Sequence, residues 1–223
     1  MVISATQRQI SEKTLELNVC AEILTLIRSN PPYRKVVWQG MTQQQERTNG
    51  LDEALRGLGN GWYLMLQFKS PWPTSLVDLQ YKFSINSEQH ATLVSGLARQ
   101  FPDSVFYVLP LFATWNKVDV YSPNLVNDTW LIRASEISLA QLGLQDRHRI
   151  DILKNNGELS AIINSPRLDA KILNANEAFS SPDSIVPKSG WLPSEVVQDW
   201  ASHVQDNFAP RRMRSLQALF LPA

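Results

Sequence analysis

The stretch GWYLMLQFKSPWP, residues 61–73, carries the pattern that decides the fold. An apolar run of this length, bounded by glycine and proline, is typical of a buried strand. Side chains two residues apart on a strand point the same way, so Gln67 and Lys69 share one face. Leu66 and Phe68 share the opposite face. Because lysine is rarely buried without a partner, the end of this strand opens either to water or to a site.

The composition is that of a folded protein with no overall charge bias. The chain has 223 residues, of which 43% are hydrophobic and seven are tryptophan, enough for one sizeable core. The 21 basic and 21 acidic residues cancel, so net charge indicates no polyanionic partner, although a local patch can still bind phosphates. Cys20 is the only cysteine, which excludes an intrachain disulfide and a cysteine-based zinc cluster.

The sequence shows no sign of membrane insertion or export. No apolar stretch reaches the roughly 18 residues that span a bilayer. The N-terminal residues MVISATQRQISEK lack the apolar region of a signal peptide. We therefore expect a cytoplasmic protein that has no membrane partner.

The segment from Ser11 to Asn30 has the features of an amphipathic helix. Ser11 is a suitable N-cap, and Glu12 lies in the first turn, where the helix dipole favours an anion. Two prolines after Asn30 end the helix. Glu12 and Glu16 stack on one face near its start. The apolar residues that recur at spacings of three and four are Leu15, Leu17, Val19, Cys20, Ile23, Leu24, Leu26 and Ile27.

Further strands and helices alternate along the chain. The expected strands cover residues 35–40, 62–69, 79–85, 104–112 and 128–137, and the expected helices cover residues 87–101 and 194–208. Such alternation predicts an α/β (α+β) fold with a central mixed sheet flanked by helices. Beyond about residue 145 the pattern weakens. We therefore predict a core of residues 1–145 and a peripheral C-terminal extension, residues 146–223, packed on it.

The segment before the central strand is glycine-rich. LRGLGNGW, residues 55–62, lacks the Lys-Ser/Thr and the following helix of a phosphate-binding loop. Asn60-Gly61 is a favoured two-residue turn. We predict a hairpin here, between Asp52 and the strand that carries Gln67.

The order of these residues resembles the PD-(D/E)xK nuclease superfamily, which has the restriction-endonuclease-like fold. In that family a first-helix glutamate, an aspartate entering a hairpin and an (E/Q)-x-K at the end of the next strand converge on a divalent metal. Asp52 lies fifteen residues before Gln67. The sequence LMLQFK, residues 64–69, is similar to the Q-x-K version of Mrr-like and Holliday-junction-resolvase-like members. The resemblance covers roughly residues 11–112.

The resemblance implies a metal-dependent DNA endonuclease that uses magnesium or manganese. Asp52 would be the principal metal ligand, and Gln67 would offer its amide oxygen. Glu16 would add a second carboxylate, with Glu12 as the alternative because the sequence does not fix the helix phase. Lys69 would orient or activate the attacking water and steady the phosphate.

The resemblance also implies a partner and a setting. DNA is the expected partner, and cleavage of both strands would favour a twofold homodimer. The setting would be bacterial defence or a mobile element. Gln67 stands where most members have glutamate, so the site has one negative charge fewer and should bind a cation more weakly. The alternative is a catalytically inactive nuclease-fold module that binds nucleic acid or a protein partner.

Structural interpretations compete with the catalytic ones. Gln67 and Lys69 are also typical of a solvated edge strand, and Asp52 of a helix cap. The Glu12 and Glu16 pair is also typical of a solvated helix face.

Basic residues and histidines admit the same alternative. His90 fits a surface or packing position, and His148 lies between Arg147 and Arg149 in what can be a solvated basic patch. Arg211, Arg212 and Arg214 could contact phosphates or simply be solvated. The sequence contains no G-x-S-x-G, P-loop, G-x-G-x-x-G or H-E-x-x-H motif.

Overall fold

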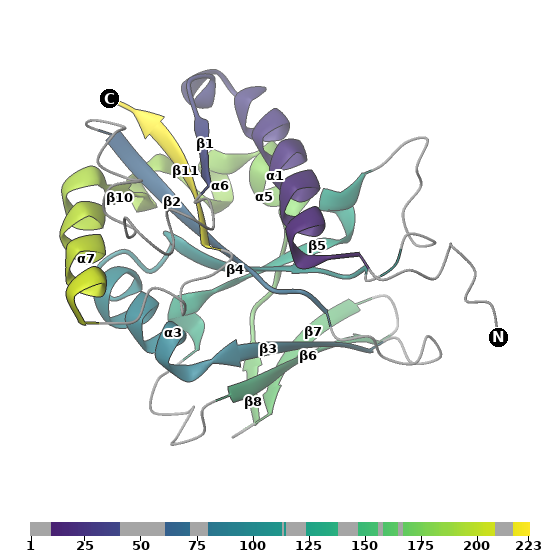
Figure 1. The fold of residues 1–223 in the computed structure, drawn as a ribbon. Coiled ribbons are helices and arrows are strands. Elements are labelled where there is room, and N and C mark those ends of the chain that lie inside the picture. The colour runs from purple at the N-terminus through teal and green to yellow at the C-terminus, as the bar shows by residue number, and fades with distance from the viewer. Residues whose placement is uncertain are drawn as a thin grey trace.

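The computed structural model describes residues 10–40, 61–71, 80–112, 114, 124–137, 147–155, 158–164, 167–207 and 216–223. The fold is mixed α/β, with two sheets and helices packed around them (Figure 1), as the sequence predicts. Asp52 and the tail residues Arg211, Arg212 and Arg214 lie outside the described residues.

The larger sheet has seven strands in the order β1-β11-β2-β4-β5-β9, with β10 also paired to β2. Its strands are β1 (Val37–Gly40), β2 (Gly61–Phe68), β4 (Val105–Pro110), β5 (Thr129–Arg133), β9 (Leu173–Asn174), β10 (Leu192–Pro193) and β11 (Leu216–Pro222). β2 and β4 run parallel, and the other pairs are antiparallel.

The smaller sheet is a four-stranded antiparallel sheet in the order β3-β6-β7-β8. It consists of β3 (Gln80–Asn86), β6 (Arg147–Asn155), β7 (Glu158–Asn164) and β8 (Arg167–Ala170). It lies below the larger sheet in Figure 1, on the side away from α1.

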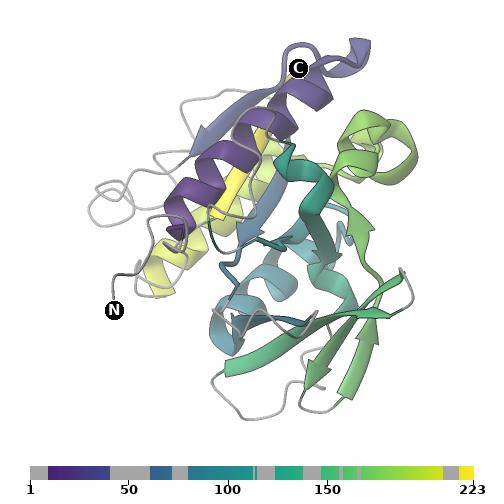
Figure 2. The same ribbon diagram turned by 90° about the vertical axis from the view of Figure 1, so that its right-hand side faces the viewer.

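The helices pack on both sides of the larger sheet. They are α1 (Glu12–Arg28), α3 (Ser87–Leu93), α5 (Ala175–Ser180), α6 (Pro182–Ile185) and α7 (Ser194–Asn207). A π-helical turn, Val94–Ala98, extends α3, and short 3-10 turns cover Pro31–Tyr33, Leu125–Asp128, Ala134–Glu136 and Lys188–Gly190. Figure 2 shows α1 running across one side of the larger sheet.

The alternation of side chains along β2 produces two cores. Tyr63 and Met65 face α3, α7 and the smaller sheet, whereas Leu64, Leu66 and Phe68 face α1 and α5. All five are buried. Both faces of β2 are therefore covered, which is why its sequence reads as an almost continuous apolar run.

α7 packs tightly against the π-helical turn. A methyl group added at Gly96 would lie 2.2 Å from the Trp200 ring, so only glycine allows this approach. The Trp200 indole nitrogen donates a hydrogen bond to the carbonyl oxygen of Thr92 at 3.1 Å. The predicted helix over 87–101 is thus interrupted where α7 docks.

The first helix begins as predicted, and the structure fixes its phase. The Ser11 hydroxyl accepts a hydrogen bond from the Thr14 backbone N–H at 3.1 Å. Leu17, predicted to lie on the apolar stripe, is 59% exposed. Glu16 is only 2% exposed, so this glutamate and not Leu17 turns toward the sheet.

Residues after 146 are not peripheral, contrary to the sequence-based prediction. β6, β7 and β8 build the smaller sheet with β3, and β11 lies inside the larger sheet between β1 and β2. Ile150, Ile152, Ala218 and Phe220 belong to the same core as the central strand. The expected boundary at residue 145 therefore does not coincide with a boundary between sheets.

Candidate functional site

The end of β2 carries the polar residues that the sequence singles out. Gln67 and Lys69 point to the same side, as strand periodicity predicts, and both bond Gln89 of α3. The Lys69 ammonium donates to Gln89 Oε1 at 2.7 Å, and Gln89 Nε2 donates to Gln67 Oε1 at 2.9 Å. We call Gln67, Lys69 and Gln89 the amide–lysine cluster.

The local sequence explains how Gln89 comes to this position. Asn86 caps α3, and its side-chain oxygen accepts a hydrogen bond from the Gln89 backbone N–H at 2.9 Å. Gln89 is the third residue of the helix, where a glutamine often reaches back to the cap. Here its side chain instead reaches across to β2.

Hydrogen-bonding chemistry fixes the orientation of both amides. An ammonium group only donates, so the Gln89 atom facing Lys69 is the oxygen, and its NH₂ group faces Gln67. Gln67 Nε2 in turn donates to the carbonyl oxygen of Phe68 at 3.2 Å. The chain of donors and acceptors is therefore consistent from Lys69 to the backbone.

Lys69 is a cation in a poorly solvated place. Burial lowers its pKa from 10.5 to about 8, and the charge of Glu12 acts in the opposite direction. The ammonium also lies 5.7 Å from the centroid of the Tyr107 ring. Its position at the carboxyl end of β2, beside the parallel β4, is where open α/β sheets usually bind ligands.

His90 is a neutral core histidine beside this cluster. Its Nε2 lies 2.7 Å from the carbonyl oxygen of Ile137, which can only accept, so Nε2 carries the proton. Nδ1 then accepts from the Tyr107 hydroxyl at 2.8 Å. The His90 pKa is lowered to about 4, chiefly by burial; the bond to Ile137 acts in the opposite direction, and the electrostatic effects of His148 and Lys69 add to the lowering. Of the two alternatives for His90, packing is correct.

His148 is not part of a solvated patch. It is 3% exposed and lies on the inner face of β6, beside the core. Strand alternation turns Arg147 and Arg149 to the opposite, outer face, where both are exposed.

The two glutamates of α1 differ in their surroundings. Glu12 is exposed, and its charge raises the pKa of Lys69. Glu16 is buried and forms an ion pair with Lys13. Burial, followed by the charge of Glu16, raises the pKa of the Cys20 thiol, so Cys20 is a protonated core residue.

The described residues do not make a metal centre by themselves. Among them, no group of three or more histidine, cysteine, aspartate or glutamate side chains could hold a metal ion. Gln67 Oε1 already accepts from Gln89. Asp52, the principal ligand expected from the sequence, lies outside the described ranges.

The hairpin predicted before β2 falls on residues 52–60, which lie outside the described residues. β11 occupies one edge of β2 over Gly61–Gln67, while β10 and β4 share the other edge over Trp62–Phe68. Both edges of β2 thus have partners among the described strands. The residue paired with Gln67 on the neighbouring strand is Leu216, because an apolar segment far along the chain takes that place.

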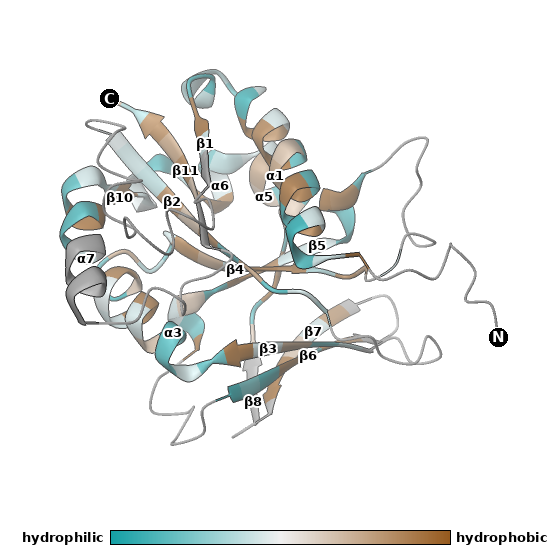
Figure 3. Cartoon of the chain, viewed as in Figure 1, coloured by the Kyte–Doolittle hydropathy of each residue, from teal (hydrophilic) through white to brown (hydrophobic). Residues whose placement is uncertain are grey.

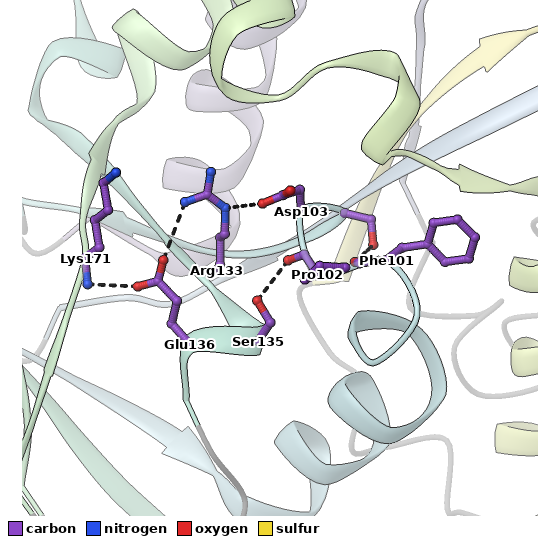
Figure 4. Close-up of polar contacts among 8 residues, drawn as sticks. Phe101, Pro102, Asp103, Arg133, Ser135, Glu136 and Lys171 are labelled. Atoms are coloured by element: carbon purple, nitrogen blue, oxygen red, sulfur yellow. Dashed lines mark hydrogen bonds and ion pairs between the residues drawn. The ribbon is translucent and has the colours of Figure 1, made fainter.

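A second polar network lies on the same sheet, around Arg133 of β5 (Figure 4). The guanidinium forms ion pairs with Asp103 and with Glu136, the latter at 3.4 Å. Glu136 also accepts a hydrogen bond from the Lys171 backbone N–H at 2.8 Å, and Ser135 donates to the Pro102 carbonyl oxygen at 2.9 Å. We call Arg133, Asp103 and Glu136 the arginine network.

Sequence reasoning did not identify Gln89. A signal was present, because Asn86-x-x-Gln89 is a helix-start pattern that directly follows a strand. The pattern indicates where the helix begins but not which strand its third residue faces.

Comparisons with protein-family models, with curated proteins and with solved structures found no match. Within the described ranges, no helix has both the length and the apolar composition needed to cross a membrane.

Proposed function

We propose that the chain is a metal-dependent DNA endonuclease of the PD-(D/E)xK type that hydrolyses phosphodiester bonds. Lys69 is the residue that faces the phosphate. Gln89 accepts a hydrogen bond from its ammonium, Gln67 accepts one from Gln89, and the charge of Glu12 favours the charged form of the lysine. A cytoplasmic location, action on DNA as a homodimer and a role in bacterial defence or in a mobile element belong to the same proposal.

One observation supports the proposal above the others: a lysine at the carboxyl end of a buried strand is held by a neutral amide. A structural lysine in such a place is normally paired with a carboxylate. With a pKa near 8, Lys69 can donate a proton or a hydrogen bond to a developing negative charge near neutral pH. Lysine binds phosphate as a compact point charge.

The proposal includes a divalent metal ion. Magnesium or manganese would bring charge neutralisation and a more acidic water to the phosphate. The described residues do not fit an ion by themselves, because Gln67 Oε1 and Glu16 already have partners. Asp52 and Glu12 would be the carboxylates that hold it.

The test is plasmid nicking with manganese by wild type, Lys69→Ala and Gln67→Glu. Lys69→Ala should lower the rate by about 100-fold or more, since one preorganised donor is worth that much. Gln67→Glu should keep or raise the rate, because it restores the missing carboxylate. Lys171→Ala, which removes an exposed lysine, is the control and should cleave like wild type. Equal background cleavage by all four proteins would end the proposal.

A second test concerns the metal ligand. Millimolar manganese should raise the Tm of the wild type and not that of Asp52→Ala, because the ion binds only the folded state. A Tm that metal leaves unchanged in both proteins contradicts the metal-dependent mechanism.

The alternative function is an inactive nuclease-fold module that binds nucleic acid or a protein. Two observations favour it: Gln67 Oε1 is engaged by Gln89, and Leu216 lies beside Gln67 on the neighbouring strand. In that case DNA binding would persist in the Lys69→Ala variant, while no variant and no metal would give cleavage.

A further inference from the structure

The amide–lysine cluster is a chain of hydrogen bonds that runs in one direction. The Lys69 ammonium donates to Gln89 Oε1 at 2.7 Å, and Gln89 Nε2 donates to Gln67 Oε1 at 2.9 Å. Gln67 Nε2 then donates to the carbonyl oxygen of Phe68 at 3.2 Å. The chain therefore connects the ammonium, through two amides, to a peptide group at the end of β2.

The two amides of this chain are more deeply buried than the lysine. Gln67 is 1% exposed and Gln89 is 4% exposed, whereas Lys69 is half-buried. Gln89 comes from the first turn of α3, which Figure 3 shows as hydrophilic. Because Lys69 is the most exposed of the three, a ligand that arrives from solvent meets the lysine first and has the amides behind it.

This geometry disagrees with a metal-binding role for Gln67. The resemblance of the sequence assigns Gln67 Oε1 to a divalent ion, but in the structure this atom accepts a hydrogen bond from Gln89. The same bond has another effect. It keeps the NH₂ group of Gln89 turned toward β2, so that the amide oxygen of Gln89 faces the Lys69 ammonium.

We propose that Gln67 is a positioning residue for Lys69 and not a metal ligand: it orients Gln89, and Gln89 orients the ammonium toward a phosphate of DNA. This inference rests on the proposed function, which places the phosphate at Lys69. An ammonium has three N–H groups, so the bond to Gln89 leaves two for phosphate oxygens. A lysine that is already held in one orientation loses less conformational entropy when the phosphate binds.

The test measures DNA binding without any metal. A short fluorescent DNA duplex is titrated with protein in EDTA at constant NaCl concentration, and anisotropy gives the Kd. If Gln67 were only a metal ligand, its substitution would leave this Kd unchanged. Positioning predicts that Gln89→Met raises the Kd by about three- to tenfold, since a less restrained lysine must be ordered on binding. Gln67→Met should raise the Kd by up to the same factor.

A double variant tests whether the two glutamines act in series. Because Gln67 acts on the ammonium through Gln89, the double variant Gln67→Met, Gln89→Met should bind DNA no more weakly than Gln89→Met alone. Independent contributions would multiply instead. NMR of the side-chain amides gives a second readout: DNA in EDTA should shift the Gln89 signal in the wild type and not in Lys69→Met.

The control replaces a glutamine outside the cluster. Gln198 is a half-buried glutamine of α7, and Gln198→Met should bind DNA like wild type. Methionine is close to glutamine in size, so each substitution removes polar atoms with little change in volume. A Tm within a few degrees of wild type for each variant shows that the fold is retained.

The outcomes separate this inference from the proposed nuclease activity. An unchanged Kd for Gln67→Met overturns the positioning role, even if the wild type nicks plasmid. Tighter binding by Gln89→Met overturns it too, because Gln89 would then compete with the phosphate. Weaker binding in series, without any nicking, supports the positioning role and leaves the nuclease proposal to fall alone. A wild type that binds no DNA contradicts the positioning role as well.

Discussion

Two cations on the larger sheet, Lys69 and Arg133, have opposite kinds of partner. Arg133 lies between the carboxylates of Asp103 and Glu136, with 18% of its side chain exposed. Lys69 has a neutral amide as its hydrogen-bond acceptor, and the charge of Glu12 offsets only part of the effect of burial on its pKa. The arginine network is a balanced ion-pair cluster that ties three segments together. The amide–lysine cluster leaves its charge poorly compensated, and under the proposed function this charge serves a ligand and not stability.

The largest expected difference between the two cations is their pH dependence. Below about pH 8 Lys69 is charged in both the folded and the unfolded chain, so the penalty of burying its charge is fully present. Between about pH 8 and 10.5 the folded chain releases this proton before the unfolded chain does, and wild-type stability rises with pH. Lys69→Met lacks this rise. Between pH 7 and pH 10 the unfolding free energy of wild type should therefore rise by roughly 2–3 kcal/mol relative to that of Lys69→Met.

The measurement is urea unfolding at several pH values. Arg133→Met is the matched control, since a guanidinium does not titrate in this range and its difference from wild type should stay constant. A pH-independent difference between wild type and Lys69→Met would show that Lys69 keeps an ordinary pKa.

The next largest effect tests the arginine network. Glu136→Ala removes an ion pair to Arg133 and the acceptor for the Lys171 backbone N–H, and should lower the free energy of unfolding by about 1–2 kcal/mol. Glu177→Ala, which truncates an exposed glutamate, should change it by less than about 0.5 kcal/mol. Chemical denaturation gives both values. Equal losses would mean that the network adds no stability of its own.

A smaller effect of opposite sign is expected at the amide–lysine cluster. At pH 7 Lys69→Met removes a burial penalty of roughly 3 kcal/mol but leaves Gln89 Oε1 without its donor, at a cost of about 1–3 kcal/mol. We expect a net stabilisation of about 1 kcal/mol. Lys171→Met on the surface should be neutral. If Lys69→Met destabilised the protein instead, Lys69 would have a structural role like that of Arg133.

The smallest effect is the response to salt. Raising NaCl to about 0.5 M should reduce the cost of Glu136→Ala by a few tenths of a kcal/mol, because partly exposed pairs are screened. The stabilisation by Lys69→Met should not change with salt concentration, since it arises from removing a buried charge. Parallel denaturation series at low and high salt decide this, and equal salt dependence would remove the distinction between the two cations.

Features with a short sequence period were predictable. The alternation in residues 61–69 predicts that Gln67 and Lys69 share a face, and Ser11 predicts the start of α1. The same alternation around His148 separates it from Arg147 and Arg149, although composition alone suggested one basic patch. In each case the chain's local geometry fixes the direction of the side chain.

Features that depend on distant pairing were not predictable. β11 lies beside β2, and no local signal in either segment names the other as its partner. Gln89 meets Lys69 only because α3 docks at the end of β2. Glu16 is buried because the whole helix is rotated by its packing, which a wide apolar stripe leaves open. The candidate site was therefore predicted on β2, but its third member was not.

The position of β11 has a consequence for protein synthesis. Leu216 follows Phe68 by 148 positions in the chain, yet β11 fills the space between β1 and β2. At about 5–20 residues per second, β2 is made roughly 7–30 s before β11. During that interval an apolar strand has one edge unpaired, a state that invites aggregation and that chaperones bind. The nascent chain should therefore be a chaperone client, and the sheet can close only once β11 has been made.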